Sequence, residues 1–254
     1  PSPRRRPVKR PALHTPKTRA LSIPHLSCAS GQILPVEAIG AWAQDRGLWY
    51  FVDGSQALGM TPVDVRAIQC HAYATSGHKW LLGPKGTGFL YVREDALDLI
   101  RATSVGAYSN EGPFDLRTGA YQFHPSAQRY EYGTLNGPLI AGLGAAFTFL
   151  ADLGLNHIHH HDLTLANQLR EGLYQLDADV LSPDTPATRS AIITFRLPNL
   201  PYQELQSFMI QKHRLRVRGI YEGGLNAIRV SLHLYNTVEE VERVLEAVEA
   251  AKKM

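Results

Sequence analysis

A carboxylate and an amine each follow an apolar segment of this chain, and together they could act on a bound group. Asp53 comes directly after residues 48–52, and Lys79 follows residues 72–75 by a Ser-Gly-His step. Opposite charges at neighbouring strand ends are unfavourable to bury unless they pair with each other or serve a bound group. The spacing alone leaves two interpretations open, an ion pair at the edge of a sheet or two groups that serve a cofactor.

The segments around these residues have the pattern of a sheet with helices packed on it. Residues 48–52 are all apolar, which is typical of a strand buried on both faces, as in parallel sheets. Further strands are predicted at 20–27, 72–75 and 88–92, with a helix at 34–44. Alternating strands and helices indicate an α/β fold, in which ligands bind outside the carboxyl ends of the strands.

The second half of the chain predicts a smaller unit. We expect a helix from Asn156, with that residue as its cap, and a last helix that Thr237 opens with a capping box. The other expected elements are an irregular stretch at 103–136, helices at 138–153 and 201–212, and strands at 190–195, 215–217 and 228–232.

These patterns predict the organisation of the chain. A basic, proline-rich tail is expected at 1–19. The distal part of an incomplete three-layer α/β/α large domain, with a mostly parallel sheet, is expected at 20–153. A smaller α+β C-terminal domain is expected at 154–254.

The composition argues against several function classes. Seven of the 26 Lys and Arg residues lie in residues 1–19, and the other 19 basic residues face 23 acidic ones. The body of the chain is therefore net negative, and no nucleic-acid partner is expected. No stretch approaches the roughly 20 apolar residues that span a bilayer, so no membrane partner is expected. Two cysteines, Cys28 and Cys70, predict no disulfide framework and a reducing, cytoplasmic setting.

Five blocks of the sequence carry a family resemblance. They start at Asp53 (Asp-Gly-Ser-Gln-Ala-Leu-Gly), Tyr73 (Tyr-Ala-Thr-Ser-Gly-His-Lys-Trp), Gly83 (Gly-Pro-Lys-Gly-Thr-Gly-Phe-Leu-Tyr), Arg129 (Arg-Tyr-Glu-Tyr-Gly-Thr-Leu-Asn) and Ile228 (Ile-Arg-Val-Ser-Leu-His-Leu-Tyr-Asn-Thr). In order and spacing they resemble the class V aminotransferases, a pyridoxal-phosphate family that includes cysteine desulfurases, kynureninases and isopenicillin N epimerase-like proteins. The resemblance covers about residues 20–252.

This resemblance implies pyridoxal 5'-phosphate as the cofactor and gives Lys79 the central role. In the family, the matching lysine forms a Schiff base with the cofactor aldehyde and then moves protons at the substrate α-carbon. Asp53 matches the acid that keeps the pyridine nitrogen protonated, so that the ring accepts electrons. Gln56 matches the residue that bonds the ring hydroxyl.

Other positions match the phosphate and substrate contacts of the family. Ser76 and His78 match phosphate-binding residues. Thr134 matches a residue that reaches the phosphate from the partner subunit, which implies a homodimer. Arg229 matches the arginine that grips the substrate carboxylate, a group that suits a guanidinium fork.

The resemblance implies an enzyme that acts on an α-amino acid, as an aminotransferase or an isopenicillin N epimerase-like protein. The alternatives are a carbon–sulfur or carbon–carbon lyase of the same family, or a truncated fragment without catalytic activity.

Three features depart from the family pattern. The loop at 217–226, where desulfurases carry a reactive cysteine, has none, so desulfuration through a protein thiolate is disfavoured. Cys28 stands where many members have an asparagine near the ring hydroxyl. The family has a long segment before the position of Ala20, so the N-terminal part is expected to be missing.

Two clusters have simpler interpretations than a ligand site. His157, His159, His160 and His161 lie together without a cysteine or paired acid, so a solvated polar face is expected and no metal. The glycine-rich residues 83–88 lack the Lys-Ser/Thr ending of a phosphate loop, so no nucleotide site is expected.

Overall fold

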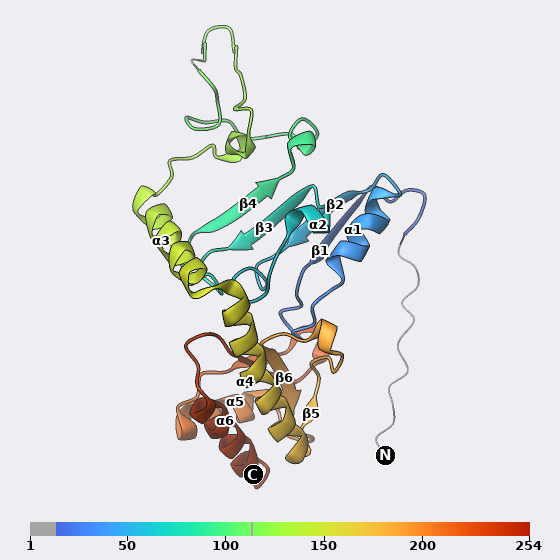
Figure 1. The fold of residues 1–254 in the computed structure, drawn as a ribbon, viewed down its shortest axis with the longest axis vertical. Coiled ribbons are helices and arrows are strands. Elements are labelled where there is room, and N and C mark those ends of the chain that lie inside the picture. Colours follow the sequence, from blue (N-terminus) through green and yellow to red (C-terminus); the bar gives the residue numbers. More distant parts are fainter. Residues whose placement is uncertain (1–13, 113) are drawn as a thin grey trace.

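The computed structural model describes residues 14–112 and 114–254, so most of the expected basic tail lies outside the described residues. The first sheet has the strand order β1 (Ala20–Pro24), β2 (Trp49–Asp53), β3 (Ala72–Ser76) and β4 (Gly88–Val92) (Figure 1). β1, β2 and β3 are parallel, and β4 is antiparallel to β3. The carboxyl ends of the three parallel strands therefore lie at one edge. The expected α/β class with a mainly parallel sheet is confirmed.

Two helices, α1 (Val36–Gln44) and α2 (Val65–Ile68), pack against the first sheet. Tyr50 and Val52 of β2 are buried in their cluster, and Tyr50 Oη donates a hydrogen bond to the Val36 carbonyl at 3.0 Å. Trp49 and Phe51 are only half-buried. Successive side chains of a strand point to opposite faces, so only one face of β2 is fully covered within the described residues. The prediction that residues 48–52 are buried on both faces is wrong.

Two long helices lead from the first sheet to the second (Figure 1). α3 (Gly137–Leu153) begins at Asn136, whose side chain accepts a hydrogen bond from the Leu139 amide at 3.2 Å. α4 (Leu155–Gln175) follows after Gly154 alone, which has φ +85°. Asn156 lies inside α4, so its predicted role as the cap is wrong, because Gly154 both ends α3 and begins α4.

Among the described residues, no single helix is long and apolar enough to cross a bilayer. α3 and α4 meet that criterion only when taken together, as a pair bent by 78°.

The second sheet is antiparallel throughout and has the order β5 (Asp179–Val180), β6 (Ile192–Arg196), β8 (Ala227–Ser231) and β7 (Arg218–Ile220). α5 (Tyr202–His213) and α6 (Val238–Ala251) complete this region. The capping box predicted at Thr237 is confirmed. Short 3-10 helices lie at Glu94–Ala96, Ala127–Tyr130, Pro186–Thr188 and Glu222–Gly224.

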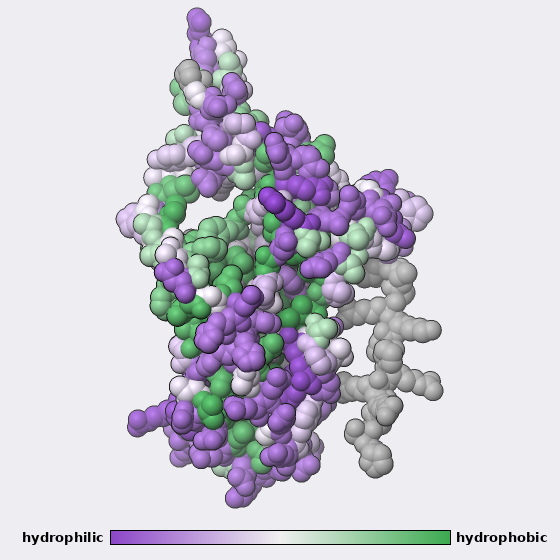
Figure 2. All heavy atoms as spheres, in the orientation of Figure 1, coloured by the Kyte–Doolittle hydropathy of each residue, from purple (hydrophilic) through white to green (hydrophobic). Residues whose placement is uncertain are grey.

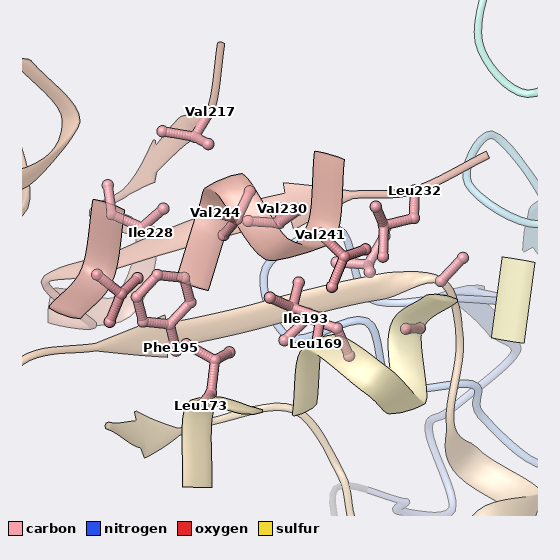
Figure 3. Packing of buried hydrophobic residues seen from close by; sticks show 14 of the residues in the cluster. Leu169, Leu173, Ile193, Phe195, Val217, Ile228, Val230, Leu232, Val241 and Val244 are labelled. Carbon is pink, nitrogen blue, oxygen red and sulfur yellow. The ribbon is translucent and has the colours of Figure 1, made fainter. Parts of the chain in front are cut away.

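The largest apolar core lies between the second sheet and its helices (Figure 3). Leu169 and Leu173 of α4 pack with Ile193 and Phe195 of β6, and each of these four side chains is fully buried. Val241 and Val244 of α6, with Ile228 and Val230 of β8, close the same cluster. Burial of one such aliphatic side chain stabilises the fold by roughly 1.5–3 kcal/mol, so this core anchors the half of the chain that carries β8.

A loop after β1, residues 28–31, joins the two sheets through its backbone. Each of its four carbonyl oxygens accepts a hydrogen bond from a side chain of the second sheet or its flanking turns. The pairs are Arg229 to Cys28 (2.9 Å), Thr194 to Ala29 (2.7 Å), Ser182 to Ser30 (2.7 Å) and Ser190 to Gly31 (2.6 Å). Because Thr194, Ser182 and Ser190 are buried, these bonds fix the end of β1 against β6 and β8.

An exposed apolar surface lies where β4 meets α3. Phe89 of β4 and Phe147 of α3 meet edge to face with ring centroids 5.8 Å apart, yet both are more than two-fifths exposed. Figure 2 shows the hydrophobic side chains gathered over this region. Of the stretch 103–136 that was expected to be irregular, residues 103–112 and 114–126 form no helix or strand and project from the end of the sheet in Figure 1, whereas Ala127–Tyr130 is a 3-10 helix.

Candidate active site

A cavity of about 260 Å³ lies where the loops of the first sheet meet β8 of the second. Its lining residues are Gln56, His78, Lys79, Trp80, Arg229, Ser231, His233 and Tyr235. Four of the residues singled out from the sequence, Gln56, His78, Lys79 and Arg229, thus line one cavity. They come from positions up to 173 residues apart in the chain, so only the packing of the two sheets brings them together.

Lys79 lies in the tight turn that follows β3. The Gly77 amide donates to the Thr87 carbonyl at 2.8 Å, and the Leu82 amide donates to the Lys79 carbonyl at 3.0 Å. Leu82 adopts φ +58°, a conformation that a branched side chain rarely takes. The backbone of Lys79 is therefore held by bonds on both sides, and its half-buried side chain reaches the cavity.

Asp53 is the last residue of β2 and is exposed, with its Oδ1 accepting a hydrogen bond from the Ser55 amide at 2.9 Å. It forms no ion pair with Lys79, although both residues are described, so the simple ion-pair interpretation fails. Gln56 accepts a hydrogen bond from Trp80 Nε1 at 2.9 Å, which fixes the orientation of its amide. Asp53 lies at the strand edge beside the cavity and is not part of its lining.

Ser76 and Thr134 are not in the cavity lining. Ser76 ends β3 and is half-buried. Thr134 is exposed in the segment that precedes α3. Within the described part of one chain, the structure therefore does not bring Thr134 into the cavity with Lys79.

Arg229 reaches the cavity from β8 with part of its guanidinium uncommitted. One Nη1–H donates to the Cys28 carbonyl at 2.9 Å, while the buried Nε has no hydrogen-bond partner among the described residues. Burial lowers the pKa of Arg229, and Arg218, its partner across β7 and β8, adds to this shift. Because Arg229 lines the cavity, an anionic ligand there can accept a charge-assisted hydrogen bond from its guanidinium.

The sequence analysis missed His25, which is buried directly after β1. Its Nδ1 lies 3.0 Å from Tyr73 Oη, and its amide donates to the Asp53 carbonyl at 2.8 Å. Burial lowers the pKa of His25 to about 4 and raises that of Tyr73, so the hydrogen bond between them joins two neutral side chains. The position of His25 could have indicated a role, because it lies at the carboxyl end of the first strand as Asp53 lies at the carboxyl end of the second.

The sequence analysis also missed a buried pair formed by His233 and Asp162. His233 Nδ1 lies 2.8 Å from Asp162 Oδ2, and His233 Nε2 lies 2.9 Å from the Trp80 carbonyl oxygen. Burial raises the pKa of Asp162, and the hydrogen bond from His233 opposes that shift. No spacing rule links two residues that are 71 positions apart, so the sequence held no signal for the pair.

The histidine cluster of α4 is only partly solvated. His159 contacts the Met60 carbonyl at 3.0 Å and His161 the Asn236 carbonyl at 3.2 Å, while His157 and His160 are exposed. The expectation of a fully solvated face is wrong for the first two, because α4 packs between the two halves of the chain. Among the described residues, no group of three or more His, Cys, Asp or Glu could hold a metal ion.

Comparison with known proteins decides the family. The profile named Aminotransferase class-V matches residues 8–244. The chain belongs to the class V aminotransferase family. The resemblance based on the five sequence blocks is thus confirmed.

Sequence relatives of this class V chain include two kinds of enzyme. A cysteine desulfurase of Klebsiella pneumoniae subsp. pneumoniae is 34% identical over 96% of this chain and 61% of its own. An isopenicillin N epimerase of Amycolatopsis lactamdurans is 32% identical over 94% of this chain and 61% of its own. The chain spans about three fifths of the length of these relatives.

Solved structures similar to this chain include a cysteine desulfurase and a C–S lyase. The apo structure of a cysteine desulfurase from Thermococcus onnurineus NA1 matches 92% of this chain and 60% of its own, with a TM-score of 0.85 and 29% identity. The cystine C–S lyase C-DES, in complex with its product cysteine persulfide, matches 92% of this chain and 61% of its own, with a TM-score of 0.82 and 28% identity.

Proposed function

We propose that this protein is a pyridoxal-5'-phosphate-dependent enzyme that acts on an α-amino acid, with Lys79 as its catalytic amine. The observation that carries the proposal is the cavity in which Lys79, Gln56, His78 and Arg229 meet at the carboxyl ends of the strands. Such a site requires an amine that attacks a carbonyl carbon, which a lysine provides. It also requires a group that binds a carboxylate, which a guanidinium provides.

The polar groups at this site fit the proposed cofactor. Asp53 Oδ2 has no hydrogen-bond partner among the described residues, so that carboxylate remains able to accept a hydrogen bond from a protonated ring nitrogen. Gln56 supplies an amide for a ring hydroxyl, and Ser76 and His78 supply donors for a phosphate. When bound, pyridoxal phosphate supplies an aldehyde for an amine and a ring that takes up the electrons left at the substrate α-carbon.

The residues of this chain divide the remaining tasks between them. Arg229 lines the cavity, and its guanidinium binds the substrate carboxylate and thereby orients the α-carbon. Lys79 takes the proton from that carbon and returns it, because its amine lies in the same cavity. In a homodimer, Thr134 of the partner subunit adds a phosphate contact, which agrees with the exposure of this residue in one chain.

Within this class, we propose carbon–sulfur cleavage ahead of amino transfer, the reaction first expected from the sequence. The relatives include desulfurases and a cystine C–S lyase, which supports this order. The loop thiolate of the desulfurases has no counterpart here, because residues 217–226 hold no cysteine, and burial raises the pKa of Cys70 to about 11. Epimerisation at the α-carbon is the second candidate, favoured by the epimerase relative.

Covalent capture of the cofactor tests the proposal. The protein is mixed with pyridoxal phosphate, reduced with borohydride and mapped by mass spectrometry. A pyridoxyl group is expected on Lys79, and Lys79→Ala is expected to abolish it. Lys85→Ala, which alters an exposed lysine six positions away, is the matched control and should leave the adduct intact. An unlabelled Lys79 in the wild-type protein contradicts the proposal and favours a fragment without catalytic activity.

The outcome of the reaction is tested with substrates. L-Cystine is expected to yield a persulfide together with pyruvate and ammonia, whereas epimerisation inverts the α-carbon and leaves the side chain intact. A keto acid formed together with an aminated cofactor instead indicates amino transfer.

A further inference from the structure

The carbonyl oxygen of Trp80, the residue next to Lys79, is held by a histidine from the other half of the chain. His233 Nε2 lies 2.9 Å from that oxygen, and His233 Nδ1 lies 2.8 Å from Asp162 Oδ2. His233 is 1% exposed and Asp162 is fully buried, so water does not compete for either bond. The imidazole thus links α4, through Asp162, to the turn that carries the amine of the cavity.

The groups on either side of the His233 imidazole determine where its protons lie. A carbonyl oxygen only accepts, so His233 Nε2 carries a proton and donates it to Trp80. A single further proton lies in the bond between Nδ1 and Asp162 Oδ2. Through this bond Asp162 fixes the orientation of the ring, so that Nε2–H points toward the Trp80 carbonyl.

Trp80 is also held on its other sides. Its ring nitrogen donates to Gln56 Oε1 at 2.9 Å, and its ring meets that of His233 edge to face with centroids 5.1 Å apart. On the backbone, a Cβ added at Gly59 would lie 2.5 Å from the Trp80 carbonyl oxygen. The peptide between Trp80 and Leu81 is therefore enclosed by Gly59 and His233, and the position of Gln56 depends on the same tryptophan.

We propose that His233 is a positioning residue of this site, which holds the Trp80 carbonyl and thereby fixes the Lys79 turn and the Gln56 amide at the cavity wall, with Asp162 as the group that orients it. This role rests on the proposed function of Lys79. It assigns a purpose to a buried His–Asp pair, one member of which lines the cavity without matching a cofactor contact of the family.

Two substitutions separate the two bonds of the histidine. In His233→Asn, the amide overlays the Nδ1 position, so the bond to Asp162 remains and the Trp80 carbonyl loses its donor. In His233→Gln, the amide reaches the Nε2 position, so the bond to Trp80 remains and Asp162 loses its partner. Both variants remove the ring, so any difference between them arises from which hydrogen bond survives.

Labelling of Lys79 and stability in urea are expected to rank the two variants in opposite orders. His233→Asn should slow the borohydride-trapped labelling of Lys79 by about tenfold, the effect of one lost buried hydrogen bond, while His233→Gln stays within about threefold of wild type. In urea unfolding the order reverses, because an unpaired buried Asp162 makes His233→Gln the less stable variant. A purely structural histidine gives labelling losses that follow stability in both variants, and that result overturns the proposal.

A second readout does not depend on the cofactor. With Trp42 and Trp49 replaced by phenylalanine, the remaining emission comes from Trp80, which is 7% exposed. His233→Asn should increase the acrylamide quenching of this emission, and His233→Gln should not. If wild-type Lys79 takes no label, the proposed function fails. Positioning by His233 fails separately, when the two variants quench alike.

Discussion

Replacing Gly59 with alanine perturbs the peptide between Trp80 and Leu81, whose carbonyl oxygen also accepts the hydrogen bond from His233. Gly59 has φ +97°, and an added Cβ would lie 2.5 Å from the Trp80 oxygen, 2.6 Å from the Trp80 carbonyl carbon and 2.9 Å from the Leu81 amide nitrogen. All three are backbone atoms, which cannot rotate away as a side chain can. We expect a loss of about 1–3 kcal/mol from the forced contact, in addition to about 1–3 kcal/mol for the backbone conformation.

Gly47→Ala isolates the backbone part of this loss. Gly47 also has a positive φ, +62°, but an added Cβ there meets nothing within 4 Å. Urea unfolding of both variants, followed by circular dichroism, should therefore show Gly59→Ala to be the less stable by about 1–3 kcal/mol. Labelling of Lys79 by pyridoxal phosphate should slow only in Gly59→Ala. Equal stability of the two variants would refute the idea that the Lys79 turn is closely packed against this glycine.

Three further predictions follow from the site and its supports. Thr194→Val keeps the shape of the side chain but leaves the buried Ala29 carbonyl without its donor, so unfolding in urea should show a loss of about 1–3 kcal/mol, and an unchanged midpoint contradicts this. Because the folded pKa of His25 is about 4 against an ordinary value of 6.5, the unfolded chain binds more protons between these values. Stability should therefore fall by about 3 kcal/mol as the pH falls from 6.5 to 4, and His25→Gln should remove that slope. Arg229→Lys should raise the KM for an α-amino acid by about tenfold or more, because a lysine cannot form the guanidinium fork, and an unaltered KM excludes a carboxylate contact there.

The strands could be predicted because a buried strand leaves a continuous apolar run in the sequence. β2, β3 and β4 lie within one residue of their predicted bounds. β7 was misplaced, since residues 215–217 were expected to pair and the structure pairs Arg218–Ile220. Leu215 and Val217 are apolar because they are buried in the large core between the second sheet and its helices. Apolar patterns thus report burial, whereas the register of hydrogen bonds depends on the neighbouring strand.

The site was predictable where its residues follow strands and match family blocks, as Lys79 and Gln56 do. His233 and Asp162 could not be found, because packing of α4 against the end of β8 brings them together and no local pattern records it. The roles of Ser76 and Thr134, and the division of the chain at 153–154, stay predictions.

In the loop at residues 28–31, the backbone carries the bonds to the second sheet, and most side chains take no part in them. Its four bonds to the second sheet all end on main-chain oxygen atoms, which every amino acid provides. Side chains at positions 28 to 30 can therefore be exchanged without loosening the junction, whereas Gly31 cannot, because a Cβ there would lie 2.3 Å from the Ile192 carbonyl oxygen. Arg229 is held by the main chain of position 28 whichever side chain stands there, so the residue beside this arginine can vary in its chemistry while the arginine keeps its support.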